Sequence, residues 1–264
     1  MLTAAQQAAR AGELTASRAG VLMSGDDAAL YDLWREITGD PGYEPPDLSG
    51  VWAVQLGSHT ESLNLDWYER KTGNLVTRRG EVVTSQERDW AAATLDGWDT
   101  KLVCPVEAKH VGGFERLETV VARYVPQLHW QMYCTGADVA VLSVIVGAKE
   151  PVLEEVRRDE GYLAELLRRA DAFWECVETL TPPVALPAME APKPAVREVD
   201  MSVSNAWGYF AADWLANRDA AKRFRIVDKE LKALTPGDAK RAYGHGIQAT
   251  RARNGAVTIR EAAQ

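Results

Sequence analysis

The sequence predicts an α+β fold in which helices flank a central sheet of short strands. Helical spacing of apolar residues, or a capping glycine, marks four segments, which are residues 24–38, 58–72, 116–135 and 159–180. Short apolar runs predict strands at about residues 75–83, 90–95, 102–108 and 138–147. With 264 residues, 46% of them hydrophobic, the chain can form one good core and an appendage.

The N-terminal elements follow from spacing and turn chemistry. Ser24 is the candidate cap of the helix at 24–38, and the Pro- and Gly-rich residues 40–50 predict a loop. Gly73 occupies the usual position after the end of the helix at 58–72. The apolar face of the first helix consists of Leu30, Leu33, Trp34 and Ile37.

The next elements belong to the core. Pro126 lies inside the helix at 116–135, which therefore kinks or begins again there. The continuous apolar run at 138–147 predicts a strand buried on both faces. The helix at 159–180 has one core face, made of Leu163, Leu166, Leu167, Ala170, Phe173, Trp174 and Val177.

The C-terminal part differs in composition. Residues 181–200 carry five of the 12 prolines and predict a linker between a main domain, 1–180, and an appendage, 201–264. The appendage holds 11 Lys+Arg against 6 Asp+Glu, a charge of +5, whereas the rest of the chain holds 19 against 32, a charge of −13. Helical spacing of aromatic and basic residues, followed by a hairpin turning at Asn254-Gly255, fits either a packing or oligomerisation role or a handle for DNA or a partner protein.

Three charged residues suggest a catalytic site. Glu107 and Lys109 share one face of a strand, with Ala108 opposite, and a hairpin joining 91–95 to 102–108 would bring Asp96 beside them. Two carboxylates and an ammonium can hold a divalent metal and activate water for attack on phosphorus. Glu-x-Lys alone occurs by chance about once in a chain of this length, so the surrounding motifs decide its weight.

Those motifs occur in a fixed order through most of residues 8–180. They are RAGELTAS (10–17), LGSHTESLNLDWYERKTG (56–73), ATLDG (93–97), PVEAK (105–109) and GGFERLETVVARYVPQLHWQMYCTG (112–136). Together they resemble the PD-(D/E)xK nucleases and, within them, the phage lambda exonuclease and YqaJ-type viral recombinase family. Leu95 replaces the family's usual Pro, and His129 stands where relatives often carry a second Gln.

The resemblance implies a restriction-endonuclease-like central mixed sheet and a role for each motif residue. Asp96 and Glu107 would bind Mg²⁺, with Mn²⁺ as a substitute, while the Ala108 carbonyl adds an oxygen and Glu61 reaches the metal directly or through water. Lys109 would hold or deprotonate the attacking water. Two further residues share a helix face: Gln127 would bond that water or the lysine, and Gln131 is assigned to the DNA-binding set.

A second set implied by the resemblance would grip a 5′-terminal phosphate. It consists of Arg10, Ser17 and Thr94, with Arg18 as the fallback. A guanidinium binds phosphate in a bidentate way, and hydroxyls donate to the remaining oxygens. The alternative for Ser17 is that it caps a helix beginning near residue 18.

Other classes of protein lack support in the sequence. It has no P-loop, Gly-x-Ser-x-Gly or His-Glu-x-x-His motif, and its three cysteines and four histidines show no metal-site spacing. No run is long enough for a membrane span and the N-terminus lacks a signal peptide's apolar segment, so we expect a cytoplasmic protein. The resemblance further implies that a phage or prophage encodes it and that it acts in a bacterial host.

The expected function is therefore a metal-dependent exonuclease. It would digest one strand of duplex DNA from a free 5′ end and leave a 3′ overhang for a single-strand annealing protein. Relatives form trimeric rings, so a homo-oligomer is an expected partner state. The alternatives are an endonuclease of the same fold and a non-catalytic DNA-binding or assembly module.

Overall fold

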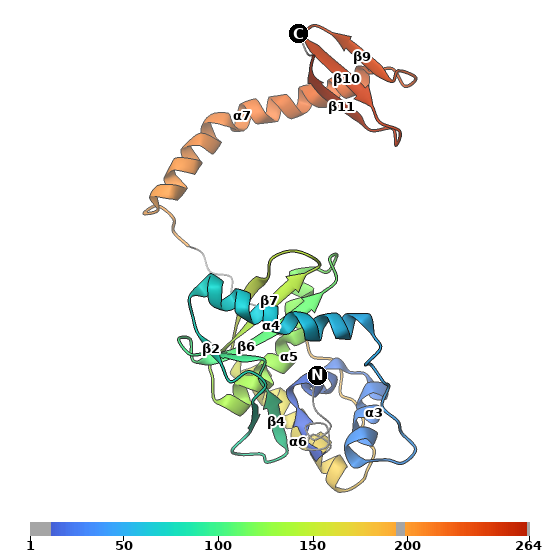
Figure 1. The fold of residues 1–264 in the computed structure, drawn as a ribbon, viewed down its shortest axis with the longest axis vertical. Helices are drawn as coiled ribbons and strands as arrows, with labels where there is room; N and C mark the ends of the chain where they lie inside the picture. The colour runs from blue at the N-terminus through green and yellow to red at the C-terminus, as the bar shows by residue number, and fades with distance from the viewer. Residues whose placement is uncertain (1–11, 194–198, 263–264) are drawn as a thin grey trace. The chain divides into compact units, whose positions relative to one another are not determined.

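The computed structural model describes residues 12–193 and 199–262 (Figure 1). The chain forms two compact units, residues 1–194 and residues 195–264, and each is described by itself. The described elements combine helices with mixed and antiparallel sheets, which confirms the predicted α+β class.

A five-stranded mixed sheet forms the centre of the first unit. Its order is β2-β5-β6-β7-β8; β6 and β7 are parallel, and the other neighbours are antiparallel. The strands are β2 (Val76–Thr77), β5 (Gly97–Asp99), β6 (Cys104–Val111), β7 (Val139–Val146) and β8 (Val152–Arg157). Six of the eight residues of β7 are buried, as the apolar run predicts, whereas the sequence pattern did not indicate β5 and β8.

A second sheet of the first unit contains three short strands in the order β1-β4-β3. They are β1 (Leu14–Thr15), β3 (Val82–Thr84) and β4 (Ala91–Thr94). The single strand predicted at 75–83 is wrong, because the chain turns at Arg78 and Gly80, both at positive φ, and passes from one sheet to the other. The hairpin predicted between 91–95 and 102–108 is also wrong, because β4 and β6 belong to different sheets and β6 pairs with β5.

The helix predicted at 24–38 is shorter in the structure and is preceded by a separate helix. The two helices are α2 (Ala19–Ser24), which follows a 3-10 turn, η2 (Ala16–Arg18), and α3 (Asp27–Thr38). Ser24 does not cap α3; it ends α2, and the side chain of Asp26 accepts the capping hydrogen bond instead. Between the two helices Gly25 has φ +72°, and a β carbon there would lie 2.6 Å from the backbone nitrogen of Ala188, so this turn requires glycine.

Helices α4 (Trp52–Thr72) and α5 (Leu117–Thr135) cover opposite faces of the five-stranded sheet (Figure 1). Asn64 of α4 bonds to Ser143, whereas Gln127 of α5 bonds to Glu107. Ser143 is in register with Ala108, and side chains alternate along a strand, so Ser143 and Glu107 point to opposite faces. The sheet is thus enclosed between two helices, and each contributes polar groups to it.

The ends of these helices show which signals are local. Gly73 follows α4 at φ +72°, as predicted. The predicted start at residue 58 is wrong, because α4 begins at Trp52. The sequence pattern missed the first turns, because they are exposed and lack apolar periodicity. Helix α5 continues through Pro126 and does not begin again. Helix α6 (Glu160–Glu178) buries Leu163, Leu166, Ala170 and Phe173, which confirms its predicted core face.

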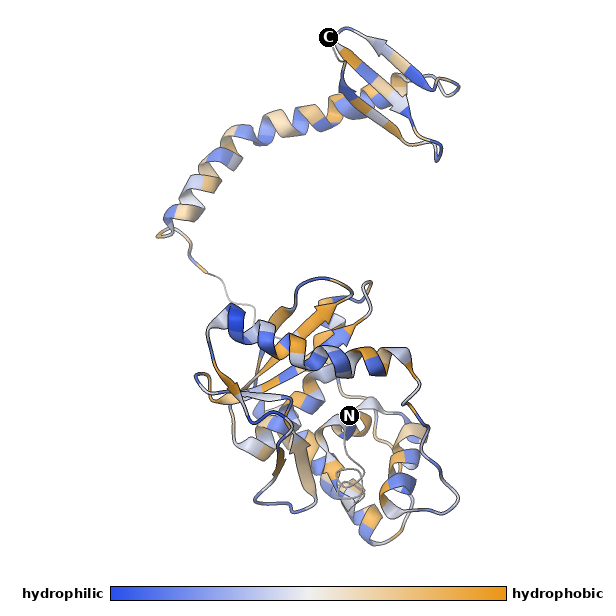
Figure 2. Ribbon diagram, in the orientation of Figure 1, coloured by the Kyte–Doolittle hydropathy of each residue, from blue (hydrophilic) through white to orange (hydrophobic). Residues whose placement is uncertain are grey.

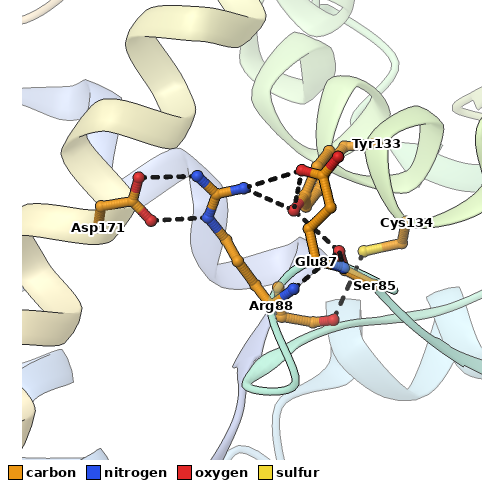
Figure 3. A network of polar contacts seen from close by, with 7 residues as sticks. Ser85, Glu87, Arg88, Tyr133, Cys134 and Asp171 are labelled. Carbon is orange, nitrogen blue, oxygen red and sulfur yellow. Dashed lines mark hydrogen bonds and ion pairs between the residues drawn. The ribbon is translucent and has the colours of Figure 1, made fainter.

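Polar contacts tie the hairpin of β3 and β4 to two helices (Figure 3). The guanidinium of Arg88 forms two hydrogen bonds with Asp171 of α6, at 2.6 and 2.8 Å, and a third with the Tyr133 hydroxyl of α5 at 2.7 Å. The Ser85 hydroxyl donates to Tyr133 at 2.8 Å and accepts from the backbone of the turn. The hairpin is therefore fixed against the same helix that packs on the central sheet.

The predicted end of the main domain at residue 180 is wrong. Met189 N–H donates to the Met23 carbonyl at 3.1 Å, and Ala185 N–H donates to Asp27 at 2.7 Å. Ala185, Met189 and Ala191 also pack against the hydrophobic core of helices α2, α3 and α6. Much of the proline-rich segment is therefore part of the first unit, and the boundary between units falls at residue 194.

The second unit contains a long helix and a three-stranded antiparallel meander. The elements are α7 (Asn205–Leu234), β9 (Arg241–Gly244), β10 (Ile247–Arg251) and β11 (Val257–Glu261). The predicted turn at Asn254-Gly255 is confirmed. A second turn, in which His245 and Gly246 are both at positive φ, adds the strand β9, which the sequence pattern did not indicate. Arg251 joins strand and helix by donating to the carbonyls of Thr235 and Pro236.

None of the helices in residues 12–193 and 199–262 is both long and apolar enough to cross a membrane.

A chain ending at Pro194 should fold by itself, because the boundary between the two compact units falls there. A chain ending at Leu180 should be about 1–3 kcal/mol less stable, because it lacks the packing of Ala185 and Met189 on the core. Urea unfolding of both chains, followed by circular dichroism, measures the difference. Unfolded or aggregated protein from the longer chain, or equal stability of the two, would contradict the boundary.

Candidate active site on strand β6

Glu107 is the most buried acid of the site. It lies on β6 with 1% of its surface exposed. The side-chain amides of Gln127 and Gln131, one turn apart on α5, donate to its two oxygens at 2.5 Å each. Lys109 forms an ion pair with it, which confirms that the two residues share one face of the strand. The carboxylate is thereby fixed in orientation by three donors.

Asp96 reaches Glu107 by a route that differs from the predicted one. It precedes β5, and the register Gly97↔Val106 places Asp96 opposite Glu107. One Asp96 oxygen accepts the Ala108 N–H at 2.9 Å. The three residues are therefore brought together as expected, but by pairing of β5 with β6.

Like charges dominate the electrostatics of the site. Burial raises the pKa of Asp96 well above its ordinary value, and the charges of Glu107 and Glu61 raise it further, against the opposing effect of Lys109. Burial lowers the pKa of Lys109, but the charges of Glu107 and Asp96 more than offset this, so that the lysine stays protonated. Three carboxylates therefore face one ammonium, an arrangement that favours an added cation.

Glu61 approaches the site from α4 and is exposed to solvent. Although its side chain is largely exposed, partial desolvation of the carboxyl, followed by the charge of Glu107, raises its pKa. One turn further along α4, Asn64 donates to the Ser143 carbonyl at 2.9 Å and accepts from the Ser143 hydroxyl at 2.6 Å. These buried bonds fix the position of α4 on the sheet and, with it, the position of Glu61.

The two glutamines act differently from the expectation. Gln127 was expected to bond the attacking water or Lys109, and in the structure it donates to Glu107. Gln131 was assigned to DNA binding, which is wrong, because its side chain is completely buried and cannot reach a phosphate backbone. Tyr124 lies on the same helix. The centre of its ring is 5.3 Å from the Lys109 ammonium, and the ring limits where that cation can move.

The donor set fits Mg²⁺. Among the described residues no three His, Cys, Asp or Glu side chains form a ready metal cage, and Mg²⁺ does not require one, because it keeps several waters and binds through one or two carboxylates. Oε1 of Gln131, next to Glu107, is buried without a hydrogen-bond partner among the described residues. A buried acceptor rarely stays unpaired, and a water bound beside the carboxylates would satisfy it.

The predicted phosphate pocket is placed only in part. Arg10 lies outside the described residues. Strand β1 pairs in parallel with β4, which contains Thr94, and the 3-10 turn that contains Ser17 follows β1 and also packs near β4. Ser17 does not cap the following helix; its hydroxyl shares a hydrogen bond of 3.2 Å with Thr15. The fallback residue, Arg18, forms an ion pair with Glu36 and donates to the Glu13 carbonyl.

Two histidines near the site are structural. His129 is buried, accepts the Asp159 N–H at 3.1 Å and bonds to the Val125 carbonyl at 2.9 Å, so it supports the start of α6. Burial lowers its pKa. His110 bridges Thr60 at 3.2 Å and the Gly147 carbonyl at 2.8 Å, which connects α4 with the sheet.

Asn64 and Ser143 are the site-positioning residues that the sequence analysis missed. One signal was available. Ser143 is the single hydroxyl-bearing residue within the apolar run 139–146, and a buried polar side chain needs a partner. The partner itself, 79 positions away, has no signal in the sequence.

Comparisons with known proteins agree with this geometry. The family model of the YqaJ-like viral recombinase domain matches residues 6–138. An alkaline exonuclease from Laribacter hongkongensis has a similar fold, with a TM-score of 0.57 and 23% identity over 66% of this chain and 92% of that one. Its complex with dAMP has a TM-score of 0.54 and 24% identity over the same shares. A phage-related exonuclease from Haemophilus somnus 129PT has a TM-score of 0.51 and 11% identity over 64% and 94%. No curated protein matches significantly.

The carboxylate of Asp96 should favour metal binding but lower the stability of the metal-free protein. Without metal, Asp96→Asn should unfold at a higher temperature than wild type, because the amide keeps the bond from Ala108 and removes a repelled, buried charge. With Mg²⁺ at about 100 times its Kd, wild type should gain about 2.7 kcal/mol and the variant should gain little. Thermal unfolding with and without Mg²⁺ tests this, with Glu154→Gln on β8 as the matched control. An equal gain in Asp96→Asn and wild type would contradict the assignment.

Proposed function

Because the chain belongs to the YqaJ-like viral recombinase family, we propose that it is a Mg²⁺-dependent deoxyribonuclease that degrades duplex DNA from its ends. Membership of a viral recombinase family supports action on DNA. The metal, the direction of digestion and the recognition of the DNA end in this proposal rest on the site residues and on the sequence motifs.

One observation carries the proposal. Asp96 lies opposite Glu107, which is buried and held by two amides and by Lys109. Burial, and then the charge of Glu107, raise the pKa of Asp96, so a bound cation would stabilise this carboxylate pair. A chain that used the sheet only for packing would gain nothing from facing these charges toward one another.

Each residue has a role in this proposal. Asp96 and Glu107 would hold Mg²⁺, or Mn²⁺ in its place, with the Ala108 carbonyl and Glu61 completing the set. The bound metal would polarise the phosphate and lower the pKa of its water. Lys109, fixed between Glu107 and the Tyr124 ring, would orient the attacking water and offset the negative charge that develops on phosphorus. Gln127 and Gln131 keep Glu107 in its ligating orientation.

We further propose digestion from a 5′ end that leaves a 3′ overhang for a single-strand annealing protein in the cytoplasm of a bacterial host. Support comes from Ser17 and Thr94, which lie on neighbouring elements, η2 and β4; Thr94 is two residues before Asp96. Together with Arg10, they would bind a terminal 5′ phosphate. A ring-shaped homo-oligomer would let the enzyme stay on its substrate.

Alanine at Asp96, Glu107 or Lys109 should each lower DNA cleavage at least about a hundredfold, because each removes charge stabilisation at phosphorus. EDTA should abolish the wild-type activity. The assay incubates end-labelled linear duplex with Mg²⁺, and Lys101→Ala, an exposed lysine outside the site, is the control. Near-normal cleavage by Glu107→Ala, or wild-type cleavage in EDTA, would refute the assignment.

Closed circular DNA in the same assay separates the alternatives. An exonuclease leaves it intact, whereas cutting of the circle would identify an endonuclease. Binding without any cleavage of linear DNA would identify a non-catalytic module.

End recognition gives a further prediction. Wild type should degrade 5′-phosphorylated duplex several-fold faster than 5′-hydroxyl duplex, because a terminal phosphate is the group that Arg10, Ser17 and Thr94 can bind. Arg10→Ala, Ser17→Ala and Thr94→Val should reduce this ratio and keep residual cleavage, while Ser49→Ala in an exposed loop leaves the ratio unchanged. Equal wild-type rates on both substrates would remove the case for the pocket.

A further inference from the structure

One face of α7 changes character along its length. At the spacing of successive helical turns, its N-terminal half carries Trp207, Ala211 and Trp214. The same face continues with five cationic residues, Arg218, Lys222, Arg225, Lys229 and Lys232. This composite face, called here the aromatic–cationic face, belongs entirely to the second unit.

The aromatic part of this face is open to solvent. Trp207 and Trp214 are 58% and 64% exposed, and with Phe210, Ala211 and Leu215 they line a shallow hollow. None of the residues of α7 is fully buried. Figure 2 shows hydrophobic and hydrophilic residues interspersed along this helix. Exposed indole rings separated by two helical turns provide flat apolar surfaces that solvent can reach.

The cationic part has few acidic partners. Arg218 lies 3.7 Å from Asp219, and Lys232 pairs with Asp228 at 2.7 Å. Among the described residues, Lys222, Arg225 and Lys229 have no ion pair within 4 Å, and all three side chains are exposed. The five cations extend along about 21 Å of helix. Helix α7 contacts β11 of the meander, but all five cations of this face are exposed, so the face is accessible.

From this geometry we propose that the aromatic–cationic face binds single-stranded nucleic acid. The row of cations would follow the phosphate backbone, and bases would stack on Trp207 and Trp214. Single strands are bound in this way, by basic grooves with aromatic platforms, because their bases are free to stack. The bases of an intact duplex are stacked on one another, so a duplex could use the cations but not the indoles.

The charge of the second unit favours this occupant over a second copy of the chain. Residues 201–264 carry a charge of +5, which a polyanion complements and a like-charged copy of this helix would not. The site is separate from the carboxylates on β6. Its test needs no DNA cleavage, so the failure of one proposal leaves the other untouched.

The experiment measures fluorescence anisotropy of a labelled oligo(dT) of about 20 nucleotides with the full chain in EDTA, over a range of salt concentrations. Trp207→Ala/Trp214→Ala should weaken binding about tenfold or more and leave the salt slope unchanged. Lys222→Gln/Arg225→Gln/Lys229→Gln should weaken binding and flatten the plot of log K against log salt by about 2. Trp207→Phe/Trp214→Phe should retain most of the affinity, because phenyl rings still stack.

Matched controls lie on the opposite side of α7. Tyr209→Ala and Arg223→Gln remove an exposed aromatic and an exposed cation there and should bind like wild type. Wild-type affinity in both face variants, or equal loss in the controls, would overturn the proposal. So would duplex outcompeting the oligonucleotide. Loss of self-association in Trp207→Ala/Trp214→Ala, seen by sedimentation with unchanged oligonucleotide binding, would assign the face to a second copy instead.

Discussion

The buried carboxylate of Glu107 is the interaction on which the first unit is organised. Removing an ion from water costs several kcal/mol, and that cost is offset only where its oxygens are fully paired. Gln127, Gln131 and Lys109 provide the pairing, each bond to a charged group contributing about 1.5–3 kcal/mol. Because the two amides come from α5, the same bonds that orient the carboxylate also set how α5 packs on β6. The packing of α5 on the sheet and the orientation of the Glu107 carboxylate therefore depend on the same hydrogen bonds.

The other two acids of the site, Asp96 and Glu61, are positioned by strand pairing and by hydrogen bonds between α4 and the sheet. Pairing of β5 with β6 puts Asp96 opposite Glu107, and the Asn64–Ser143 bonds position α4, which carries Glu61. The sheet holds these carboxylates close together even in the absence of a cation, so their mutual repulsion lowers the stability of the fold. A site of this kind is less stable than an apolar substitute would be, which is common where stability is exchanged for chemistry.

The two units differ in charge. The chain before residue 201 carries a charge of −13, so in the proposed function its attraction for a polyanion would depend on a cation bound at the site. The second unit carries a charge of +5 and exposes its cations along α7. The proposed exonuclease would have to hold both a duplex and the single strand that it produces, and the chain has two surfaces of different chemistry.

What the sequence determined by itself was local. The alternation of Glu107 and Lys109, the stop at Gly73, the buried run of β7 and the turn at Asn254-Gly255 each depend on neighbouring residues, and the structure confirms them. Tertiary structure decided whatever depends on distant pairing. The three residues of β5 are too few to show periodicity, the packing of Met189 on the core depends on α2, and the burial of Gln131 depends on how α5 meets β6. Such contacts form between segments far apart in sequence, where propensity and spacing carry no information.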